Sequence, residues 1–453
     1  MKIIIAGTGE VGFHLSKLLA QESHDIVIID HSKRALEKAT KTLDVSTVKG
    51  DATSIKTLEN AGVSKADLLI AVTSTQHVNI LSCIIGKNLG VKKCIARISK
   101  SEFLHRKETF DLKSIGIDEV IYPESLGSNE IKNLLKESAV TDSFEFENGK
   151  LQLIGIKIDE KSELKDKTLG QTIYLNPNTN FTPVAIVRDI EDKIENETII
   201  PRSHNILKKD DHAYFIADSE GGVERVLALS GKKHLDINNL MIYGGSDLAY
   251  ITAKHLSKKY NIKLICEDLV HCEKLADELP NVMVLNGLAT DIDFLREEDL
   301  DSMDAFLALS SDTEKNILAS LAAKESGVKK TISQVENIDF IPLAQNMGLN
   351  TTINIKYLTA NFIVKYIREG ELLNFTLLQG VDAEVIEVEV KENSQVLESS
   401  LKELDFPKEG IVGGIIRDND AMIPRGKFKF EIGDRVLIVT KKSGKKSIEA
   451  MFK

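Results

Sequence analysis

The chain has 453 residues, of which 42% are hydrophobic and 28% are charged, and this composition predicts a folded protein of about three or four domains. The net charge is −11 and lysine and arginine are scattered, so we expect no binding to nucleic acid. The longest apolar runs have the length of strands, far short of the roughly 20 residues that cross a bilayer, so we expect no membrane span and no signal peptide.

The first 135 residues alternate short apolar runs with amphipathic segments. The predicted strands are Lys2–Ala6, Ile26–Ile29, Val45–Val48, Leu68–Val72, Lys93–Ile98 and Glu119–Ile121. The predicted helices are Gly12–Glu22, Lys33–Thr40, Ile55–Ala61 and Gln76–Leu89. Such regular alternation predicts an α/β fold with a parallel sheet and helices on both faces, in the doubly wound arrangement of a Rossmann domain.

A glycine-rich loop joins the first predicted strand to the first predicted helix. Gly7, Gly9 and Gly12 follow the G-x-G-x-x-G pattern, and Asp30 ends the next strand. In this pattern the first glycine permits a tight turn, the second lets backbone N–H groups approach a pyrophosphate, and the third allows close helix packing. An acid at the position of Asp30 suits ribose hydroxyls and repels a 2′-phosphate, which favours NAD(H) or an adenine nucleotide over NADP(H).

Further polar side chains are expected at the carboxyl edge of the same sheet. Asp51 follows the third strand, where it either contacts the adenine end of a ligand or caps the next helix. Thr73 and Ser74 follow the fourth strand, and their hydroxyls either face the ligand or cap the helix through Asn79. Arg97 ends the fifth strand, where its guanidinium either pairs with a phosphate or with an acid at the surface or across a subunit contact.

A smaller mixed module follows a change of pattern near residue 142. Its strand-like segments include Leu151–Ile158, Pro183–Asp189 and Asp210–Ile216, with a short helix signal at Thr168–Thr172. At about 80 residues, this module is too short for a conventional substrate domain.

The whole arrangement then repeats at an offset of 237 residues. Leu240–Ala249 matches the first strand and its glycine loop, and Glu267 takes the position of Asp30. Between Ala66–Arg97 and Met303–Gln334, 12 of 32 aligned residues are identical. The small module returns as well, because Ile411–Asp418, Ile423–Arg425 and Glu431–Val439 echo Val184–Asp189, Ile200–Arg202 and Lys209–Ala217. The repeat predicts four domains, at 1–135, 140–227, 237–370 and 373–453.

The second glycine loop departs from the first at positions that matter for phosphate binding. Ser246 replaces Gly9, Ala249 replaces Gly12 and Gln334 replaces Arg97. The serine would crowd a pyrophosphate, and the loss of the arginine removes a partner for phosphate. Glu267 still supplies an acid that can bind the ribose hydroxyls. The sequence leaves open whether this second site binds a nucleotide weakly or not at all.

The sequence offers no arrangement that supports chemistry. Hydride transfer needs a proton donor or acceptor near the nicotinamide, and no His-Asp, Lys-Tyr or Cys-His arrangement is tied to the sheet edge. The histidines have no metal spacing, and we interpret His31 as lining an adenosine pocket. We therefore expect no catalytic residues and no metal site.

Neither a C-x-x-C pair nor a zinc spacing is present among the cysteines, which predicts reduced, partly buried thiols at Cys83, Cys94, Cys266 and Cys272.

A Rossmann unit followed by a small β-rich module, duplicated in tandem, resembles the TrkA family of peripheral, NAD-binding subunits of bacterial and archaeal Trk potassium uptake systems. The resemblance covers essentially the whole chain. In the Rossmann unit it rests on Gly7–Gly12 with Asp30, Gly50–Thr53, Ala71–Thr73 with Asn79, Ile95–Arg97 and Tyr122–Glu124. In the small module it rests on Val187–Asp189 and Ile200–Arg202, which fit the domains that regulate potassium conductance (RCK domains).

The resemblance implies a cytoplasmic gating ring. The chain would form a homo-oligomer, a dimer or tetramer. This ring would be peripheral at the inner face of the cell membrane, bound to a separate integral membrane potassium transporter subunit of the TrkH or TrkG type. A bound nucleotide would bias the ring between conformations and hence gate the pore. Some relatives hold a small effector in the β-rich modules, and nothing in this sequence identifies one.

The resemblance also implies which residues contact the nucleotide. In the first half these are Gly7, Thr8, Gly9, Glu10, Val11, Gly12, Asp30, Asp51, Thr73, Ser74 and Arg97. In the second half the matching positions are Gly244, Gly245, Ser246, Asp247, Leu248 and Glu267.

Two functions remain in competition. The first is a non-enzymatic nucleotide sensor that regulates potassium transport. The second is an NAD-dependent oxidoreductase that uses one half for the cofactor and the other for the substrate. The tandem repeat favours the sensor, because a dehydrogenase would combine one intact fold with a dissimilar catalytic domain. A self-contained channel is disfavoured by the absence of a membrane span. The sequence does not decide whether the ligand is NAD(H) or ATP/ADP, nor whether its binding increases or decreases potassium transport.

Overall fold

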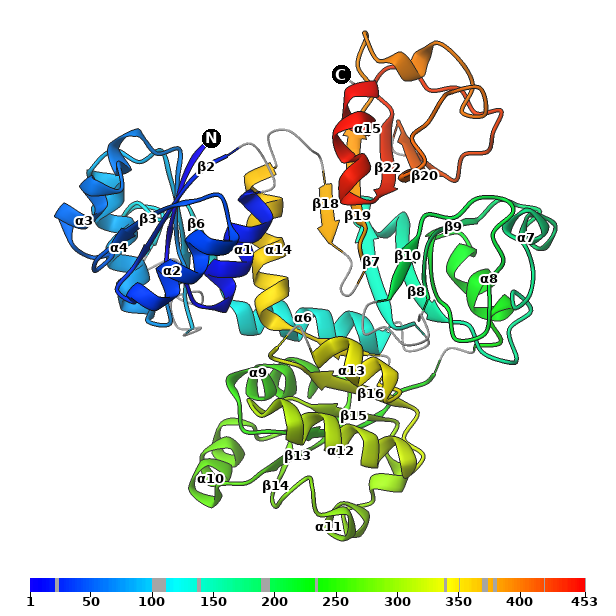
Figure 1. Ribbon diagram of the computed structural model, residues 1–453. Helices are drawn as coiled ribbons and strands as arrows, with labels where there is room; N and C mark the ends of the chain where they lie inside the picture. The colour runs from blue at the N-terminus through cyan, green and yellow to red at the C-terminus, as the bar shows by residue number, and fades with distance from the viewer. Residues whose placement is uncertain are drawn as a thin grey trace. The chain divides into compact units, whose positions relative to one another are not determined.

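The chain folds into two compact units, shown by the computed structural model in Figure 1. The first unit consists of Met1–Ser128 and Asn354–Tyr366, and the second of Asn129–Ile353 and Ile367–Lys453. The structure describes residues 1–20, 24–99, 111–136, 140–188, 196–232, 235–337, 340–349, 351–368, 374–377, 381–418 and 420–452.

The first unit is built on a parallel six-stranded sheet in the order β3-β2-β1-β4-β5-β6. The two central strands are apolar and buried on both faces, as a sheet covered by helices on both sides requires. The strands are β1 (Lys2–Ala6), β2 (Asp25–Asp30), β3 (Ser46–Lys49), β4 (Leu68–Ala71), β5 (Lys93–Arg97) and β6 (Glu119–Ile121). This confirms the predicted Rossmann fold and places its strand boundaries within about two residues.

Helices cover both faces of this sheet. They are α1 (Glu10–Ala20), α2 (Lys33–Thr42), α3 (Ile55–Asn60), α4 (Gln76–Asn88) and the beginning of α6 (Pro123–Lys136). A further helix, α14 (Ile355–Arg368), comes from the second half of the chain and lies beside α1 (Figure 1). There the ring of Tyr357 is 5.4 Å from the ring of His14.

The second unit contains the repeated Rossmann sheet, again parallel, in the order β14-β13-β12-β15-β16-β17. Its strands are β12 (Asn239–Tyr243), β13 (Asn261–Cys266), β14 (Met283–Asn286), β15 (Ala305–Ala308), β16 (Lys330–Gln334) and β17 (Thr352–Ile353). Its helices are α9 (Asp247–Leu256), α10 (Leu269–Glu278), α11 (Ile292–Glu297), α12 (Thr313–Glu325) and α13 (Ile341–Asn346). The duplication predicted from the sequence is therefore a duplication of the fold.

The two small modules of the second unit are five-stranded antiparallel sheets, in the orders β10-β9-β11-β8-β7 and β18-β19-β22-β20-β21. The first contains β7 (Asp142–Phe146), β8 (Leu151–Lys157), β9 (Phe181–Arg188), β10 (Glu197–Ile199) and β11 (His212–Asp218), with helices α7 (Leu169–Leu175) and α8 (Gly222–Leu229). The second contains β18 (Asn374–Leu377), β19 (Glu384–Glu389), β20 (Gly410–Arg417), β21 (Asp420–Met422) and β22 (Arg435–Thr440), with helix α15 (Lys445–Met451).

The two small modules share one hydrophobic core. Tyr214 and Ile216 of the first module are buried in the same cluster as Val385 and Leu437 of the second. The Gly413 backbone packs against side chains of the first module, so that a Cβ atom at this position would lie 2.2 Å from Ile216 Cδ1 and 3.1 Å from Val184 Cγ1. The pair of modules is therefore one packed body, in which a glycine sets the spacing of the two sheets.

The repeated arginines of the small modules have two distinct structural roles. Arg188 and Arg417 each pair with the aspartate at the start of the last strand of their own module, Asp211 at 2.6 Å and Asp434 at 2.7 Å. The arginines of the two Ile-Pro-Arg segments instead reach the other module. The Arg202 guanidinium donates to the Gly410 carbonyl at 3.0 Å and that of Arg425 to the Asn176 carbonyl at 2.9 Å. Asp189, which the sequence pattern includes, lies outside the described residues.

The prediction of four reduced thiols is wrong for one pair. Cys266, at the end of β13, and Cys272, in α10, form a disulfide, whereas Cys83 and Cys94 are free and buried. The turn between β13 and α10 brings the two Cα atoms to 5.9 Å, which is within the range that a disulfide spans. The spacing of six residues matches no known motif, so the sequence gives no sign of the pair.

None of the helices in the described ranges combines the length and the apolar character needed to cross a membrane. This agrees with the short apolar runs of the sequence.

Replacement of Gly413 by alanine should destabilise the joint core of the small modules. The new Cβ would collide with Ile216 Cδ1, and overpacking of this kind costs about 1–3 kcal/mol. The substitution Ile216→Val removes the colliding methyl group, so the double variant should lose less stability than the sum of the two single variants. Denaturant unfolding of the four proteins measures this, and strictly additive losses would contradict the proposed contact.

Candidate functional site

The glycine loop of the first Rossmann domain has the geometry that its sequence predicts. Gly7 has a φ of +106°, a conformation that side chains rarely adopt. A Cβ atom on Gly12 would lie 1.9 Å from the Gly7 carbonyl oxygen, so the third glycine allows α1 to pack directly on the turn. A Cβ on Gly9 would meet nothing within 4 Å, which leaves open space at the start of α1. Such a helix start is where backbone N–H groups bind phosphate.

Asp30, at the end of β2, is bound to this loop. Its carboxylate accepts hydrogen bonds from the Thr8 backbone at 2.7 Å and the Thr8 hydroxyl at 2.5 Å, and from the Ser32 amide at 2.8 Å. Burial raises the pKa of Asp30, but the hydrogen bonds from Thr8 and Ser32 outweigh it and lower the pKa below its usual value. The acid that would bind the ribose is therefore a carboxylate held mainly by neutral donors, and the ring Nδ1 of His31 lies 3.4 Å from it.

Asp51 does not cap the next helix, contrary to one of its two predicted roles. The cap of α3 is Ser54, whose hydroxyl accepts from the Thr57 amide. Asp51 is exposed and accepts from both the amide and the hydroxyl of Thr53, each at 2.8 Å, and these hydrogen bonds lower its pKa. The charge of protonated His31 adds a smaller contribution to this lowering of the pKa of Asp51.

Thr73 is engaged by the protein itself. Its hydroxyl donates to Asn79 Oδ1 at 2.6 Å and its amide donates to the same atom at 2.9 Å. The N-cap residue of α4 is Thr75, which makes no side-chain capping hydrogen bond, so these bonds to Asn79 are not a helix cap. Asn79 Nδ2 in turn donates to the carbonyl of Arg97 at 2.9 Å. This asparagine therefore ties the ends of β4 and β5 together at the carboxyl edge of the sheet. Ser74 is exposed beside them.

Arg97 carries a buried donor without an acceptor. Among the described residues, no hydrogen-bond partner of its Nε atom is found. A buried, unsatisfied guanidinium nitrogen is costly, and an anionic ligand at this sheet edge would satisfy it. This observation favours the phosphate role of Arg97 over the surface salt bridge.

One residue next to the loop was missed by the sequence reasoning. Lys356, in the first turn of α14, forms an ion pair with Glu10, the first residue of α1. Val11 follows Glu10 and is buried. The pair joins positions 346 residues apart, so no local sequence signal could have revealed it.

The second glycine loop repeats the turn but not the open space. Gly244 has a φ of +125°. The hydroxyl of Ser246 accepts from the Ala249 amide at 3.1 Å as the N-cap of α9, and donates to the Leu309 carbonyl at 2.5 Å. Asp247 and the buried Leu248 continue the helix as Glu10 and Val11 do. The serine that we predict to crowd a pyrophosphate is therefore also the N-cap residue of α9.

The acid of the second site is occupied by a cation of its own domain. Lys315, in the first turn of α12, donates to both carboxylate oxygens of Glu267 at 2.8 Å, and the Tyr243 hydroxyl donates at 2.5 Å. The Lys315 hydrogen bond is the main reason that the pKa of Glu267 is lowered. The position of Lys315 corresponds to Val78 in the first half, which carries no charge.

A histidine covers the second loop. The ring Nε2 of His271 lies 2.8 Å from the Gly245 carbonyl oxygen, and a Cβ on Gly245 would meet the ring at 2.7 Å. In the place of Arg97, Gln334 donates to Glu336 at 2.7 Å. The second site thus keeps the fold of the first, while Ser246, Glu267 and the Gly245 carbonyl are engaged by groups of the same domain. Gln334 Oε1 is a buried acceptor for which no partner is found among the described residues.

The family follows from comparison with known proteins. The TrkA-N domain family matches residues 3–123 and 240–355, and the TrkA-C domain family matches residues 385–453. The Trk system potassium uptake protein TrkA homolog of Archaeoglobus fulgidus is 32% identical, with 100% of both chains covered. The Trk system potassium uptake protein TrkA of Haemophilus influenzae is 31% identical, covering 100% of this chain and 98% of the relative. The chain belongs to the TrkA family.

Solved structures place the fold among RCK assemblies. A "Crystal Structure of the GsuK RCK domain" has a TM-score of 0.58 at 17% identity and covers 100% of this chain and 94% of that chain. A "GsuK channel bound to NAD" also has a TM-score of 0.58, at 16% identity, with 100% and 78% covered. At these identities the likeness concerns the fold, and it agrees with the two Rossmann domains and two small modules of this TrkA-family chain.

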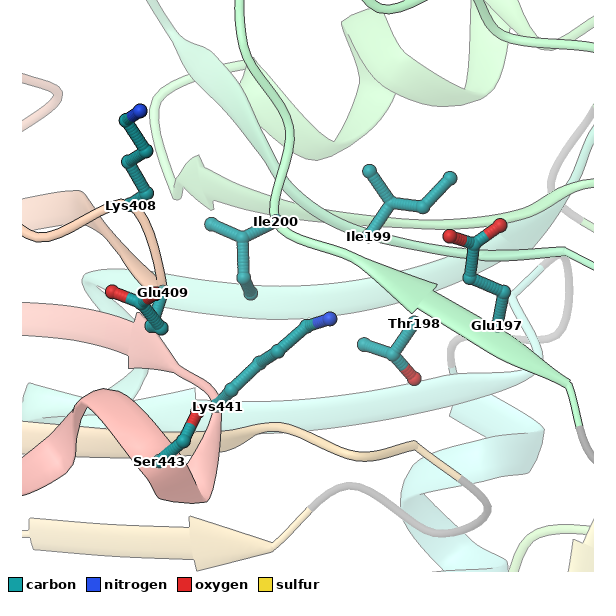
Figure 2. A pocket seen from close by; sticks show the side chains of 8 residues that line it. All are labelled: Glu197, Thr198, Ile199, Ile200, Lys408, Glu409, Lys441 and Ser443. Atoms are coloured by element: carbon teal, nitrogen blue, oxygen red, sulfur yellow. The ribbon is translucent and has the colours of Figure 1, made fainter.

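A cavity of about 370 Å³ lies between the two small modules (Figure 2). Residues 197–200 line one side, and Lys408, Glu409, Lys441 and Ser443 line the other. Lys441 extends toward β10 whereas Lys408 points away from it. Within the described residues no group of histidine, cysteine or acidic side chains could hold a metal ion. The cavity mixes charges of both signs and identifies no ligand.

Alanine substitutions should distinguish the tightly packed position of Gly12 from the open position of Gly9. Gly12→Ala should lower the free energy of unfolding by about 1–3 kcal/mol or more, because its Cβ meets the backbone of Gly7 rather than a movable side chain. Gly9→Ala, which meets nothing, should leave stability within about 0.5 kcal/mol of the parent protein. Thermal unfolding of both variants checks this, and equal destabilisation would show that the loop is packed differently.

Proposed function

We propose that this chain is a nucleotide-binding regulatory subunit of a potassium uptake system, and that it is not an enzyme. Its membership of the TrkA family and its tandem RCK-type fold support this function. Three observations carry the proposal: the open space at Gly9, the carboxylate of Asp30 bound to Thr8 of the same loop, and the Arg97 donor, at the end of β5, that has no partner among the described residues. The four domains would be divided as the sequence predicts.

The chemistry of the first site fits an adenine dinucleotide or an adenine nucleotide. The pyrophosphate would lie at the start of α1, where Gly9 leaves room and the helix N-terminus favours negative charge. Asp30 would accept the ribose hydroxyls, and Asp51 with His31 would lie at the adenine end. NAD(H) is our first choice of ligand and ATP or ADP the second.

We infer that ligand binding is concentrated in the first half. Glu267 could accept ribose hydroxyls only by releasing Lys315 and Tyr243, and a pyrophosphate at Gly245 would have to displace His271. The displacement of His271 costs free energy that the first loop does not require, because a Cβ atom at Gly9 meets nothing within 4 Å. One chain would therefore carry one working nucleotide site.

Regulation would act through a shift of conformational populations. A nucleotide changes the equilibrium of a ring only if it binds one conformation better than another. We propose that the chain forms a homo-oligomeric ring at the inner face of the membrane, bound to an integral membrane potassium transporter subunit. The resemblance does not extend to the sign of the effect.

The competing function, an NAD-dependent oxidoreductase, is less well supported. Among the described residues, the polar side chains around the first loop are Thr8, Asp30, His31, Thr73 and Arg97. The ring Nδ1 of His31 lies 3.4 Å from the Asp30 carboxylate, but the histidine side chain is 92% exposed and is not enclosed in a substrate cavity. Consumption of NADH by the purified chain with any small carbonyl substrate would overturn the sensor function.

Calorimetry of NADH, NAD, ATP and ADP with the full chain tests the proposed site. Asp30→Ala should weaken binding about 10- to 100-fold, because a hydrogen bond to a charged group contributes about 1.5–3 kcal/mol and each 1.4 kcal/mol is a factor of ten. Glu267→Ala is the matched control in the repeat, and it should leave both the affinity and a stoichiometry of one nucleotide per chain unchanged.

Two results would contradict this proposal. Tight binding that survives Asp30→Ala would place the nucleotide elsewhere. A second equivalent of ligand that disappears with Glu267→Ala would show that the second site opens and binds in solution.

A further inference from the structure

The ion pair between Glu10 and Lys356 lies at the mouth of the proposed nucleotide site. Glu10 directly follows Gly9 and begins α1, whose start would hold the phosphates. Lys356 comes from the other half of the chain. The carboxylate side chain is 65% exposed and the lysine side chain 28% exposed. The lysine is thus the more fixed partner of the two.

The position of Lys356 is determined by the packing of α14 on the first unit. Asn354 begins this helix, and its side chain accepts from the Tyr357 amide at 2.8 Å. Tyr357 lies against His14 of α1, and at the other end the ammonium group of Lys93 lies 5.4 Å from the ring of Tyr366. Contacts at both ends therefore hold the first turn of α14, with its lysine, beside the first turn of α1.

We propose that Lys356 is a phosphate-binding residue of the first nucleotide site, and that Glu10 holds it in place while the site is empty. This inference rests on the proposed function. A phosphate bound at the start of α1 would lie next to Glu10, whose carboxylate repels it and whose ammonium partner attracts it. An exposed ion pair contributes little to stability, so Lys356 loses little when it exchanges the carboxylate for a more strongly charged phosphate.

The exchange would link the nucleotide to the second half of the chain. In the sequence, α14 connects the second Rossmann domain to the second small module. A ligand that contacts Lys356 therefore contacts a helix that belongs by sequence to the second half of the chain. Such a contact can differ between two conformations of the protein, as regulation by a ligand requires.

The repeat does not provide the same lysine twice. Arg97 pairs with Ile121, and Gln334 pairs with Ile353, at equivalent places in the two sheets. Counting three residues on from these strand ends gives Glu124 in the first half and Lys356 in the second. The charge is reversed, so this contact belongs to one site only.

Calorimetric titration of the full chain with NADH and with ATP tests the role of Lys356. Lys356→Gln should raise the dissociation constant about tenfold for both ligands, which corresponds to about 1.4 kcal/mol. Lys365→Gln, on the same helix at an exposed position, removes the same charge and should change nothing. Lys356→Arg keeps the charge and should stay within about threefold of the parent protein.

The reciprocal substitution gives a second, independent readout. Glu10→Gln breaks the ion pair with Lys356 and removes a charge that repels phosphate, so it should tighten binding by about threefold or more. The gain should be smaller when Lys356 is already glutamine, and this coupling distinguishes competition for the lysine from simple repulsion. Thermal unfolding of each variant confirms that it is folded.

The outcomes separate the two proposals. If Asp30→Ala weakens binding while Lys356→Gln behaves like Lys365→Gln, the nucleotide site stands and the role of Lys356 is overturned. If Glu10→Gln gains the same affinity with and without Lys356, the exchange is overturned. If the parent chain binds neither ligand, both proposals fail.

Discussion

The partner of one carboxylate decides the character of each half of this protein. Asp30 and Glu267 end the second strand of their sheets at equivalent places. Asp30 is held by the amide and hydroxyl of Thr8 and the amide of Ser32, with the ring Nδ1 of His31 3.4 Å away. Glu267 is held by the ammonium of Lys315 and by the hydroxyl of Tyr243, so a ribose would have to replace both donors. The same fold thus presents, in one half, an acid held mainly by backbone and hydroxyl donors of its own loop and, in the other half, an acid paired with a lysine.

Much of the fold could be predicted from the sequence, because it depends on local periodicity. The strands and helices of the first Rossmann domain follow from alternating apolar runs, and the roles of Gly7 and Gly12 follow from their spacing. What could not be predicted depends on contacts between distant residues. Lys315 reaches Glu267 across 48 residues and Lys356 reaches Glu10 across 346, and neither lysine stands in a recognisable motif. The roles of Asp51 and Thr73 stayed open for the same reason, since each depends on a neighbouring side chain.

The small modules show how a repeat can be used for pairing. The arginines that are repeated in the two modules have two roles: Arg188 and Arg417 form ion pairs within their own module, and Arg202 and Arg425 donate to the other module. Because both modules are in one chain, the pairing of Arg202 with Gly410 and of Arg425 with Asn176 does not depend on protein concentration. The shared core and the glycine at position 413 make the modules one body with a fixed spacing. A cavity at their junction can therefore change only if that body is itself repacked.

Duplication within one chain allows an asymmetry that identical subunits cannot have. In a dimer of identical chains, a lysine that serves the partner's site appears in both sites, and so does any residue that closes a site. Here Lys315 has no charged counterpart at Val78, and Lys356 is opposed by an acid at Glu124. Each difference is a single substitution, and both favour nucleotide binding in the first half over the second. One loop keeps its open space and a cation beside it, while the other is filled by its own side chains. A nucleotide would then act on one half of each chain, and the helix that brings Lys356 to that half belongs by sequence to the other.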